Sequence, residues 1–389
     1  MLDGIKVLDF SRYIAGPYCG ALLAGLGAEV IRVERPEGGE DRFVGPVGDQ
    51  LSSLFLKTGC AKKSITLNFR HENAKEVVGR LVGNADVVIA NMPPKVLKGN
   101  GLDYETLKAL NPRIILTTQT CFGHEGPLAD RGGFDGIGQV MSGAAFMSGT
   151  PGQPRRAAAP YVDFATAALG AFGTLAAIIQ RQSSSEGQHV QVSLLGSAFA
   201  IFAGALIEEN LLKINRKPSG NRGQTAAPVD IIKAKDGEFI IQVVGNGLFK
   251  RLVMAIGKDD WIGRADLKTD ELRGNSRDEV CAAVASWASK QTVRDAIAKL
   301  AAAGVPCGPV LRPEEAFDHE QVQAMKLKRE FEFPGFDNLV STVRMPIDFS
   351  GFSPTEGRPP LIGEHTDEVL SNAGFSSEEI NVLREDSVI

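Results

Sequence analysis

The sequence predicts an α/β protein in which a parallel β-sheet is covered by helices on both faces. Strand-like and helical patterns alternate over residues 5–119, and the strand-like runs are almost continuous Val, Ile and Leu. The 389 residues are enough for two domains of ordinary size. We expect a large Rossmann-like domain with a parallel sheet, built from both chain ends, and a smaller α/β domain between them.

The first βαβ unit is predicted at residues 5–34. Residues 5–10 form an apolar run typical of a buried strand, residues 16–26 are small and apolar enough for a helix, and residues 28–34 return as a strand. The alternation then recurs, with a helix at 72–82, a strand at 85–90, a short helix at 104–110 and a strand at 113–119.

Ligands bind outside the carboxyl ends of the strands in sheets of this kind. The loops that follow the predicted strands are rich in Gly, Pro or polar residues, although a plain solvent turn has the same composition. The candidate ligand-binding loops are 11–15, 35–42, 91–101 and 120–135.

A second module is predicted where the composition becomes polar and turn-forming. It contains a strand at 238–244, helices at 248–256, 277–288 and 293–303, and an apolar segment at 305–310. Two extended segments flank residues 336–338, and residues 364–373 are helical in pattern. The predicted division is a large domain at 1–208, a linker at 209–228, a small α/β domain at 229–328, and a return linker with the C-terminal part of the large domain at 329–389.

The amino-acid composition limits the classes of partner that the protein is expected to bind. The net charge is −5 and no basic block exceeds a pair, which argues against nucleic-acid binding. Five scattered cysteines without metal-ligand spacing favour a reducing compartment. Residues 1–7 lack a signal-peptide pattern, and the richest apolar stretch, 165–179, is short for a membrane span. We therefore expect a cytoplasmic protein with small-molecule partners and no membrane or metal.

Asp163 precedes an apolar helical run at 164–182. An Asp at that point is a good N-cap, and the helix N-terminus is also a good place for a reactive carboxylate. Spacing alone leaves both interpretations open.

A dinucleotide site is weakly indicated by Glu34, which closes the second predicted strand where an acid holds a ribose. The turn at 11–16 has no G-x-G-x-x-G pattern, however. Basic side chains in or near the candidate loops favour an anionic ligand instead, because Arg binds phosphate oxygens in bidentate geometry. They are Arg35, Lys62, Lys63, Arg70, Lys95, Lys98 and Arg131.

Several sequence blocks resemble class III CoA-transferases, the group of formyl-CoA transferase and carnitine CoA-transferase. The blocks follow in family order from one end of the chain to the other. They are LDGIKVLDF at 2–10, AGP at 15–17, GAEVIRVE at 27–34, KKSITL at 62–67, NPR at 111–113 and LIGEHT at 361–366.

The resemblance implies that Asp163 is the catalytic aspartate, both cap and nucleophile. In the implied reaction, CoA moves from an acyl-CoA donor to a carboxylic acid through an aspartyl mixed anhydride and an aspartyl-CoA thioester. The helix N-terminus is expected to favour the ionised carboxylate by about 0.3–1 kcal/mol. No permanently bound cofactor is implied, and the family forms interlocked homodimers.

The resemblance also implies a set of CoA-binding residues. Arg70 stands where some members have a lysine, and Lys95 or Lys98 replaces a family arginine that has no match here. The implied CoA contacts are Arg12, Ala15, Arg35, Leu67, Arg70, Asn91, Met92, Lys95, Lys98 and Arg131.

Departures from the family pattern bear on the substrate. Formyl-CoA transferases have a glutamine at the position of Ile14 and a run of glycines near 223–225, which argues against oxalate. The basic rim favours a short-chain or dicarboxylic acid. Racemases of the family carry a histidine at the position of Phe134, which argues against α-proton transfer. An α-methylacyl-CoA racemase or epimerase and a non-catalytic CoA- or nucleotide-binding protein remain the alternatives.

Overall fold

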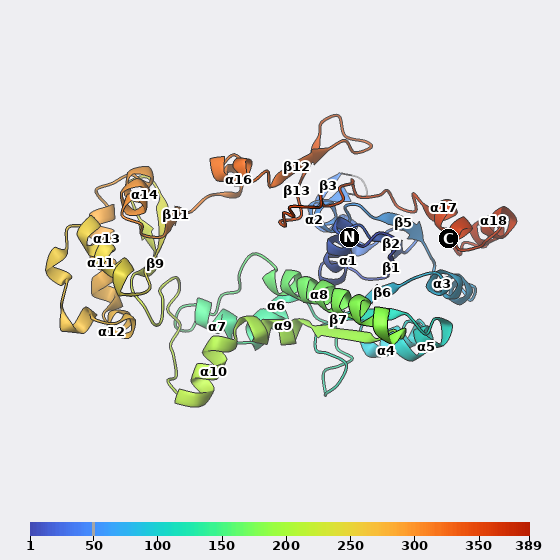
Figure 1. The fold of residues 1–389 in the computed structure, drawn as a ribbon, viewed down its shortest axis with the longest axis horizontal. Helices are drawn as coiled ribbons and strands as arrows, with labels where there is room; N and C mark the ends of the chain where they lie inside the picture. Colours follow the sequence, from blue (N-terminus) through green and yellow to red (C-terminus); the bar gives the residue numbers. More distant parts are fainter. Residues whose placement is uncertain (49–50) are drawn as a thin grey trace. The chain divides into compact units, whose positions relative to one another are not determined.

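The computed structural model describes residues 1–48 and 51–389. The chain forms two compact units (Figure 1). The first comprises Met1–Ser142, Ala157–Gly204 and Gln321–Ile389, and the second comprises Gly143–Arg156 and Ala205–Glu320. The sequence places these boundaries at 208, 229 and 329, whereas the observed second unit also includes the Gly143–Arg156 segment. Helix α10 (Ala203–Leu212) extends into the predicted linker.

The first unit is built on a parallel sheet in the order β5-β2-β1-β6-β7-β8. Strand order reverses between β1 and β6, which makes their carboxyl ends the switch point of a doubly wound sheet. The strands are β1 (Lys6–Asp9), β2 (Glu29–Glu34), β5 (Lys63–Thr66), β6 (Val87–Ala90), β7 (Ile115–Thr120) and β8 (His189–Ser193).

Apolar side chains alternate between the two faces of this sheet because successive strand residues point to opposite sides. Val7 packs in the core shared with α1 (Ala15–Gly25) and α8 (Tyr161–Ser184), and Leu8 packs in the opposite core. The C-terminal helices α17 (Thr366–Asn372) and α18 (Ser377–Glu385) cover this second face together with α3 (Ala74–Gly83).

The predicted α/β fold with a parallel sheet is therefore confirmed, and both chain ends contribute to its first unit. All six strands come from residues 6–193, and the C-terminal end adds helices to the sheet rather than strands. Strands β5 and β8 were not predicted: β5 begins with Lys63 and directly follows Lys62, and β8 is polar at every second position.

The second unit has an antiparallel sheet in the order β11-β10-β9, packed against helices around Phe239, Ile241 and Leu252. Its main elements are β9 (Val229–Lys233), β10 (Glu238–Gln242), α11 (Asn246–Ala255), α12 (Asp270–Asn275), α13 (Arg277–Ala288), α14 (Val293–Ala302) and β11 (Cys307–Pro309).

Short elements connect these layers. They are β3 (Pro46–Gly48), β4 (Leu51–Ser52), α2 (Ser53–Thr58), α4 (Pro94–Gly99), α5 (Tyr104–Leu110), α6 (Asp135–Met141), α7 (Ala144–Ser148), α9 (Leu194–Ile201), α15 (Pro313–Ala316), α16 (Glu320–Ala324), β12 (Lys328–Phe331) and β13 (Val340–Val343).

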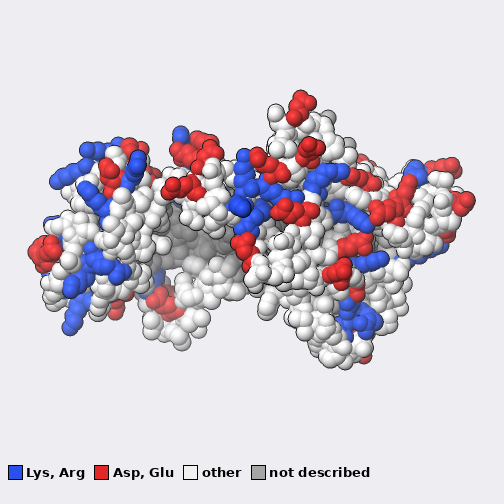
Figure 2. Space-filling view, turned by 45° about the horizontal axis from the view of Figure 1, so that its top comes forward, with Lys and Arg blue, Asp and Glu red and all other residues white. Residues whose placement is uncertain are grey.

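Two surface features bear on partners. By length and composition alone, α8 could cross a membrane, but half of its apolar window is buried, and core helices of soluble proteins meet the same criterion. On the face shown in Figure 2, basic and acidic side chains lie interspersed.

Candidate active site

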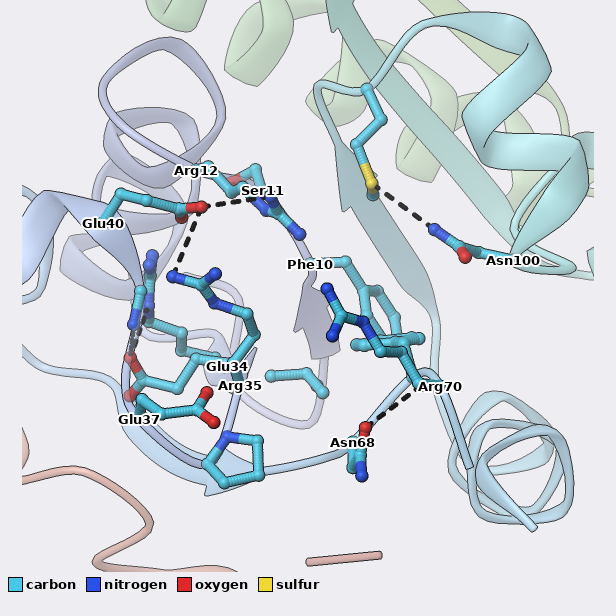
Figure 3. A pocket seen from close by; sticks show the side chains of 16 residues that line it. Phe10, Ser11, Arg12, Glu34, Arg35, Glu37, Glu40, Asn68, Arg70 and Asn100 are labelled. Carbon is cyan, nitrogen blue, oxygen red and sulfur yellow. Dashed lines mark hydrogen bonds and ion pairs between the residues drawn. The ribbon is translucent and has the colours of Figure 1, made fainter. Parts of the chain in front are cut away.

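A cavity of about 610 Å³ opens at the carboxyl ends of the first unit's strands (Figure 3). Its walls come from the segments that follow β1, β2, β5 and β6, as the switch-point rule predicts. Three of the four predicted loops contribute, together with residues 68–70 after the unpredicted strand β5. The lining residues are Phe10, Ser11, Arg12, Arg32, Val33, Glu34, Arg35, Pro36, Glu37, Gly39, Glu40, Asn68, Phe69, Arg70, Met92 and Asn100.

Besides the buried Arg32, three arginines line this cavity, Arg12, Arg35 and Arg70 (Figure 3). Arg12 Nη1 and Arg35 Nη2 lie 3.2 and 3.4 Å from the same Glu40 carboxylate oxygen. Arg70 is exposed, and no carboxylate of the described residues forms an ion pair with its guanidinium. Against these three arginines the cavity has the carboxylates Glu37 and Glu40, which leaves one positive charge in surplus for an anionic ligand.

The loop after β1 is held from two sides. Its Ser11 amide donates to Asp9 Oδ1 at 3.0 Å. Asn91 then brackets the Arg12 backbone, because the Arg12 amide donates to Asn91 Oδ1 at 2.9 Å and Asn91 Nδ2 donates to the Arg12 carbonyl at 2.6 Å. Asn91 therefore shapes the loop from behind the cavity.

Glycine at position 16 lets this loop turn directly into α1. A Cβ built at Gly16 would lie 2.1 Å from the Ser11 Cβ, well inside any tolerated contact. The loop can thus close tightly only with glycine at that position.

Beneath the cavity lies a cluster of six buried charges, three of each sign, none more than 5% exposed. Arg42 donates to both Glu34 oxygens at 2.8 and 2.6 Å, and Arg32 Nη2 donates to Asp41 at 2.5 Å. Pairing of this kind is what allows charges to be buried at all. The six residues, named here the buried charge cluster, are Asp9, Arg32, Glu34, Asp41, Arg42 and Lys62.

Glu34 is the centre of the buried charge cluster. Besides Arg42, its oxygens accept from the Gly39 amide at 2.8 Å and the Ser64 hydroxyl at 2.7 Å. The same hydroxyl accepts from the Gly363 amide at 3.0 Å. Both carboxylate oxygens are therefore engaged within the protein, which argues against Glu34 as a ribose-binding acid.

Asp163 lies in the first turn of α8 and is 7% exposed. The predicted N-cap role is wrong, because α8 begins at Tyr161 and Asp163 is its third residue. The capping oxygen comes from elsewhere: Asp135 Oδ1 accepts from the Val162 amide at 2.7 Å and the Asp163 amide at 3.3 Å.

The electrostatics at Asp163 also differ from expectation. Burial, and then the negative charge of Asp135, raise the pKa of Asp163 from 3.8 to about 7. That change corresponds to roughly 4 kcal/mol, whereas a helix N-terminus contributes about 0.3–1 kcal/mol at an exposed site. Desolvation and like charge outweigh the helix dipole, so the carboxylate is not held in the ionised form.

Packing connects Asp163 to the cavity loop. Ala15 belongs to a small core cluster with Val162, and the Tyr13 ring meets Phe134 edge-on at 5.1 Å. Arg12, earlier in the same loop, lines the cavity. One five-residue loop thus runs from the cavity to the start of α8.

The structure brings together part of the predicted CoA set. Arg12, Arg35, Arg70 and Met92 line the cavity. Leu67 is buried in the core beside it, and Ala15 packs near Asp163. Lys95, Lys98 and Arg131 are exposed and do not line it, so their contacts with CoA stay predictions.

Sequence reasoning missed several residues of the site. Asn68, Phe69 and Asn100 line the cavity, and Asp135 and Gln139 stand behind Asp163. Asn68 could have been found from strand β5, because residues that follow a strand of a parallel sheet lie at its ligand-binding edge. No local pattern relates Asp135 to a helix that begins 26 residues later. Among residues 1–48 and 51–389, no cluster of three or more His, Cys, Asp or Glu side chains could hold a metal ion.

Known proteins are similar in sequence to this chain along nearly its whole length. Residues 2–366 match the model of CoA-transferase family III. The succinate–glutarate CoA-transferase of Agrobacterium fabrum is 36% identical, with 95% of each chain covered. The formyl-CoA:oxalate CoA-transferase of Rhodopseudomonas palustris is 31% identical over 97% of this chain and 95% of that protein.

A solved structure of a CaiB/BaiF family protein from Brucella suis superposes with a TM-score of 0.83 and 32% identity. It covers 96% of this chain and 99% of the other. The doubly wound sheet, the arginine-lined cavity at its switch point and these matches along the whole chain lead to one conclusion. The protein belongs to CoA-transferase family III.

Proposed function

We propose that the protein transfers CoA from an acyl-CoA to a free carboxylic acid, with Asp163 as the nucleophile. The observation that carries this proposal is a buried carboxylate at the start of α8, joined by one loop to an arginine-lined cavity. Covalent catalysis by a carboxylate divides a difficult exchange into easier steps.

The proposed steps balance without an external base. An Asp163 oxygen attacks the thioester carbonyl, the C–S bond breaks, and a mixed anhydride and CoA thiolate result. The thiolate attacks the aspartyl carbonyl, releasing the donor acid and leaving an aspartyl-CoA thioester. The acceptor carboxylate attacks the carbonyl of that thioester, the C–S bond breaks, and a second mixed anhydride and CoA thiolate result. The thiolate then attacks the acceptor's acyl carbonyl, the anhydride C–O bond to Asp163 breaks, and the new acyl-CoA is released. Asp163 ends as a carboxylate.

The cavity is proposed to hold the CoA moiety. Arg12, Arg35 and Arg70 offer cationic donors to its phosphates, and Phe10, Phe69 and Met92 supply apolar walls. As acceptor we propose a dicarboxylic acid, supported by the relative from Agrobacterium fabrum, which is named for succinate and glutarate.

A homodimer is also proposed. The solvent-facing side of α8 carries Phe172 at 72% and Ile179 at 67% exposure, and α10 carries Leu211 at 72%. Exposed apolar patches of this kind mark interaction surfaces. A cytoplasmic location follows as a proposal from the cysteine pattern.

The covalent intermediate gives the direct test of the proposed function. Protein incubated with succinyl-CoA or glutaryl-CoA and then quenched with hydroxylamine is expected to carry a hydroxamate on the peptide that contains Asp163. Peptide mass spectrometry locates the modification, and Asp135 in the neighbouring segment serves as the internal control. Modification elsewhere, or none in a protein that exchanges acyl groups, would contradict the Asp163 mechanism. Solvent deuterium appearing at the α-carbon without acyl-enzyme would favour the racemase alternative.

The cavity arginines give a second prediction. Arg35→Ala and Arg70→Ala are each expected to raise KM for the acyl-CoA roughly tenfold with little change in kcat, because a hydrogen bond to a charged group contributes about 1.5–3 kcal/mol. Steady-state kinetics with varied acyl-CoA measures this. Arg384→Ala is the control, since Arg384 is an exposed arginine of α18 in the same unit and does not line the cavity. An equal rise in KM for all three variants would contradict the assignment of the cavity.

A further inference from the structure

Asp135 is a buried carboxylate, 6% exposed, directly behind the proposed nucleophile. Its Oδ1 accepts from the Val162 and Asp163 amides at 2.7 and 3.3 Å. Its Oδ2 accepts from the Gln139 side-chain amide. Asp135 therefore accepts three hydrogen bonds and donates none of them, as an ionised carboxylate does. The first turn of α8 has no capping side chain of its own.

Gln139 fixes the orientation of Asp135. It is 1% exposed and lies one turn later on α6. Gln139 Nε2 donates to Asp135, while its Oε1 accepts from the Ala157 amide at 2.7 Å. Because the Ala157 amide can only donate, the Gln139 atom that faces it must be the oxygen Oε1. The atom that faces Asp135 is therefore the nitrogen Nε2.

Close packing keeps α6 against α8. A Cβ built at Gly138 would lie 2.8 Å from Val162 Cγ1 and 3.3 Å from the Leu194 carbonyl oxygen. Glycine at position 138 lets α6 approach α8 and α9 closely enough for the Asp135 carboxylate to reach the amides of the first turn.

We propose that Asp135 is a positioning residue for Asp163: it holds the first turn of α8 in place and opposes ionisation of the nucleophile with its own negative charge. This proposal rests on the function proposed for Asp163. When two carboxylates share a site, one of them is driven to hold a proton. Hydrogen-bond donors around Asp135 stabilise its negative charge, so Asp163 is the carboxyl group that holds the proton.

The consequence for catalysis is a more reactive nucleophile. A carboxylate that is harder to ionise is also more basic, and nucleophilic strength rises with basicity in Brønsted fashion. With the pKa of Asp163 raised to about 7 by burial and by Asp135, a substantial fraction is still ionised at neutral pH. Asp163 is thus ionised often enough to react at neutral pH and is also a stronger nucleophile than an ordinary carboxylate.

Other titratable groups near the pair keep one charge state around neutral pH. Burial, and then Asp163, raise the pKa of the Cys121 thiol to about 11, while the positive charge of Arg131 opposes this rise. Burial and Asp135 raise the pKa of the Tyr161 phenol above its usual value. A titration near pH 7 is therefore assignable to Asp163.

Two variants separate the charge of Asp135 from its hydrogen bonds. Asp135→Asn removes the charge, keeps an oxygen for the two amides and sets an NH₂ against the NH₂ of Gln139. The double variant Asp135→Asn with Gln139→Glu restores a donor–acceptor pair between the two side chains and still accepts from Ala157. It moves the carboxylate from position 135 to position 139, one turn along α6.

The test is a carboxyl ¹³C NMR titration of protein labelled at aspartate, with the Asp163 signal assigned by its loss in Asp163→Asn. The wild-type midpoint is expected near pH 7, and Asp135→Asn is expected to lower it by about one pH unit or more. The acid limb of kcat/KM shifts by the same amount, with KM for acyl-CoA unchanged within about twofold. The double variant is expected to regain kcat relative to Asp135→Asn.

An unchanged Asp163 midpoint in both folded variants would overturn the positioning role. If the midpoint shifts as expected but the wild-type protein transfers no CoA, the proposed function fails while the coupling of the two carboxylates stands, because the NMR titration needs no turnover. If Asp135→Asn does not fold, the double variant alone decides, since all of its hydrogen bonds to the first turn and to Ala157 have partners.

Discussion

Asp163→Asn is expected to reduce CoA transfer at least about 10³-fold, because removing a covalent nucleophile leaves only binding and electrostatic contributions. Asparagine has the shape of the protonated side chain, so the first turn of α8 keeps its contacts with Asp135. Steady-state exchange between an acyl-CoA and a free acid measures the loss. CoA affinity, measured by calorimetry, is expected to stay within a few-fold of the wild type.

The stability of this variant provides the control. Burial and the charge of Asp135 raise the pKa of Asp163 from 3.8 to about 7, so its ionised form destabilises the folded protein. This penalty is absent at low pH, grows between pH 4 and 7, and is complete above pH 7. Asp163→Asn is therefore expected to be more stable than the wild type at pH 8, by roughly 2–4 kcal/mol, and equal to it near pH 4. Retained turnover, or a variant less stable than the wild type at pH 8, would contradict this account.

Glu34→Gln is expected to lower the free energy of unfolding by roughly 3–5 kcal/mol, because it removes one of the three negative charges that balance three positive charges in the buried charge cluster. Glu34 is 3% exposed and accepts from Arg42, Ser64 and the Gly39 amide. Urea unfolding at pH 7 measures the difference. The same contacts hold the floor of the cavity, so CoA binding weakens in parallel.

The pH dependence of this loss has a definite sign. Burial alone would raise the pKa of Glu34, but the hydrogen bonds from Arg42 and the charges of Arg32 and Arg42 lower it from 4.5 to about 2. The stabilisation is present above pH 4.5 and is lost as the pH falls towards 2. The difference in the free energy of unfolding between the wild type and Glu34→Gln should therefore become smaller as the pH falls from 4.5 towards 2.

Glu76→Gln is the matched control for the buried pair. Glu76 forms an ion pair with Arg80, also at a distance near 2.8 Å, but its side chain is 62% exposed. An exposed pair contributes about 0–1 kcal/mol. Equal losses for the two variants would show that burial does not decide the strength of these pairs.

Much of the fold could be predicted because the relevant signals are local. The apolar run at β1, the small-residue helix α1 and the strand β2 were predicted within one or two residues of their observed ends. Strand β5 was missed because Lys62 and Lys63 were counted among the basic side chains expected to face an anionic ligand. The structure pairs Lys62 with Asp9 at 2.7 Å inside the core.

The candidate site could be predicted only in part. Arg12, Arg35 and Met92 fall in predicted loops after strands, and the switch-point rule brings such loops together. Arg70 follows β5, which was not predicted, and was implied by the resemblance. Asn91 falls in one of these loops as well, yet it bonds the Arg12 backbone behind the cavity. Position in a loop does not reveal which way a side chain turns.

The amino-acid order alone was sufficient for the α/β class, for the resemblance to CoA-transferases and for Asp163 at the start of a helix. Each of these depends on periodicity or on short contiguous blocks. The tertiary structure decided that Asp135, 28 residues earlier, caps α8, and that burial and then the charge of Asp135 raise the pKa of Asp163. It also decided that six charges meet beneath the cavity. Buried charges respond to their distances through space and to the water they lose, and both depend on how segments far apart in the chain are folded together.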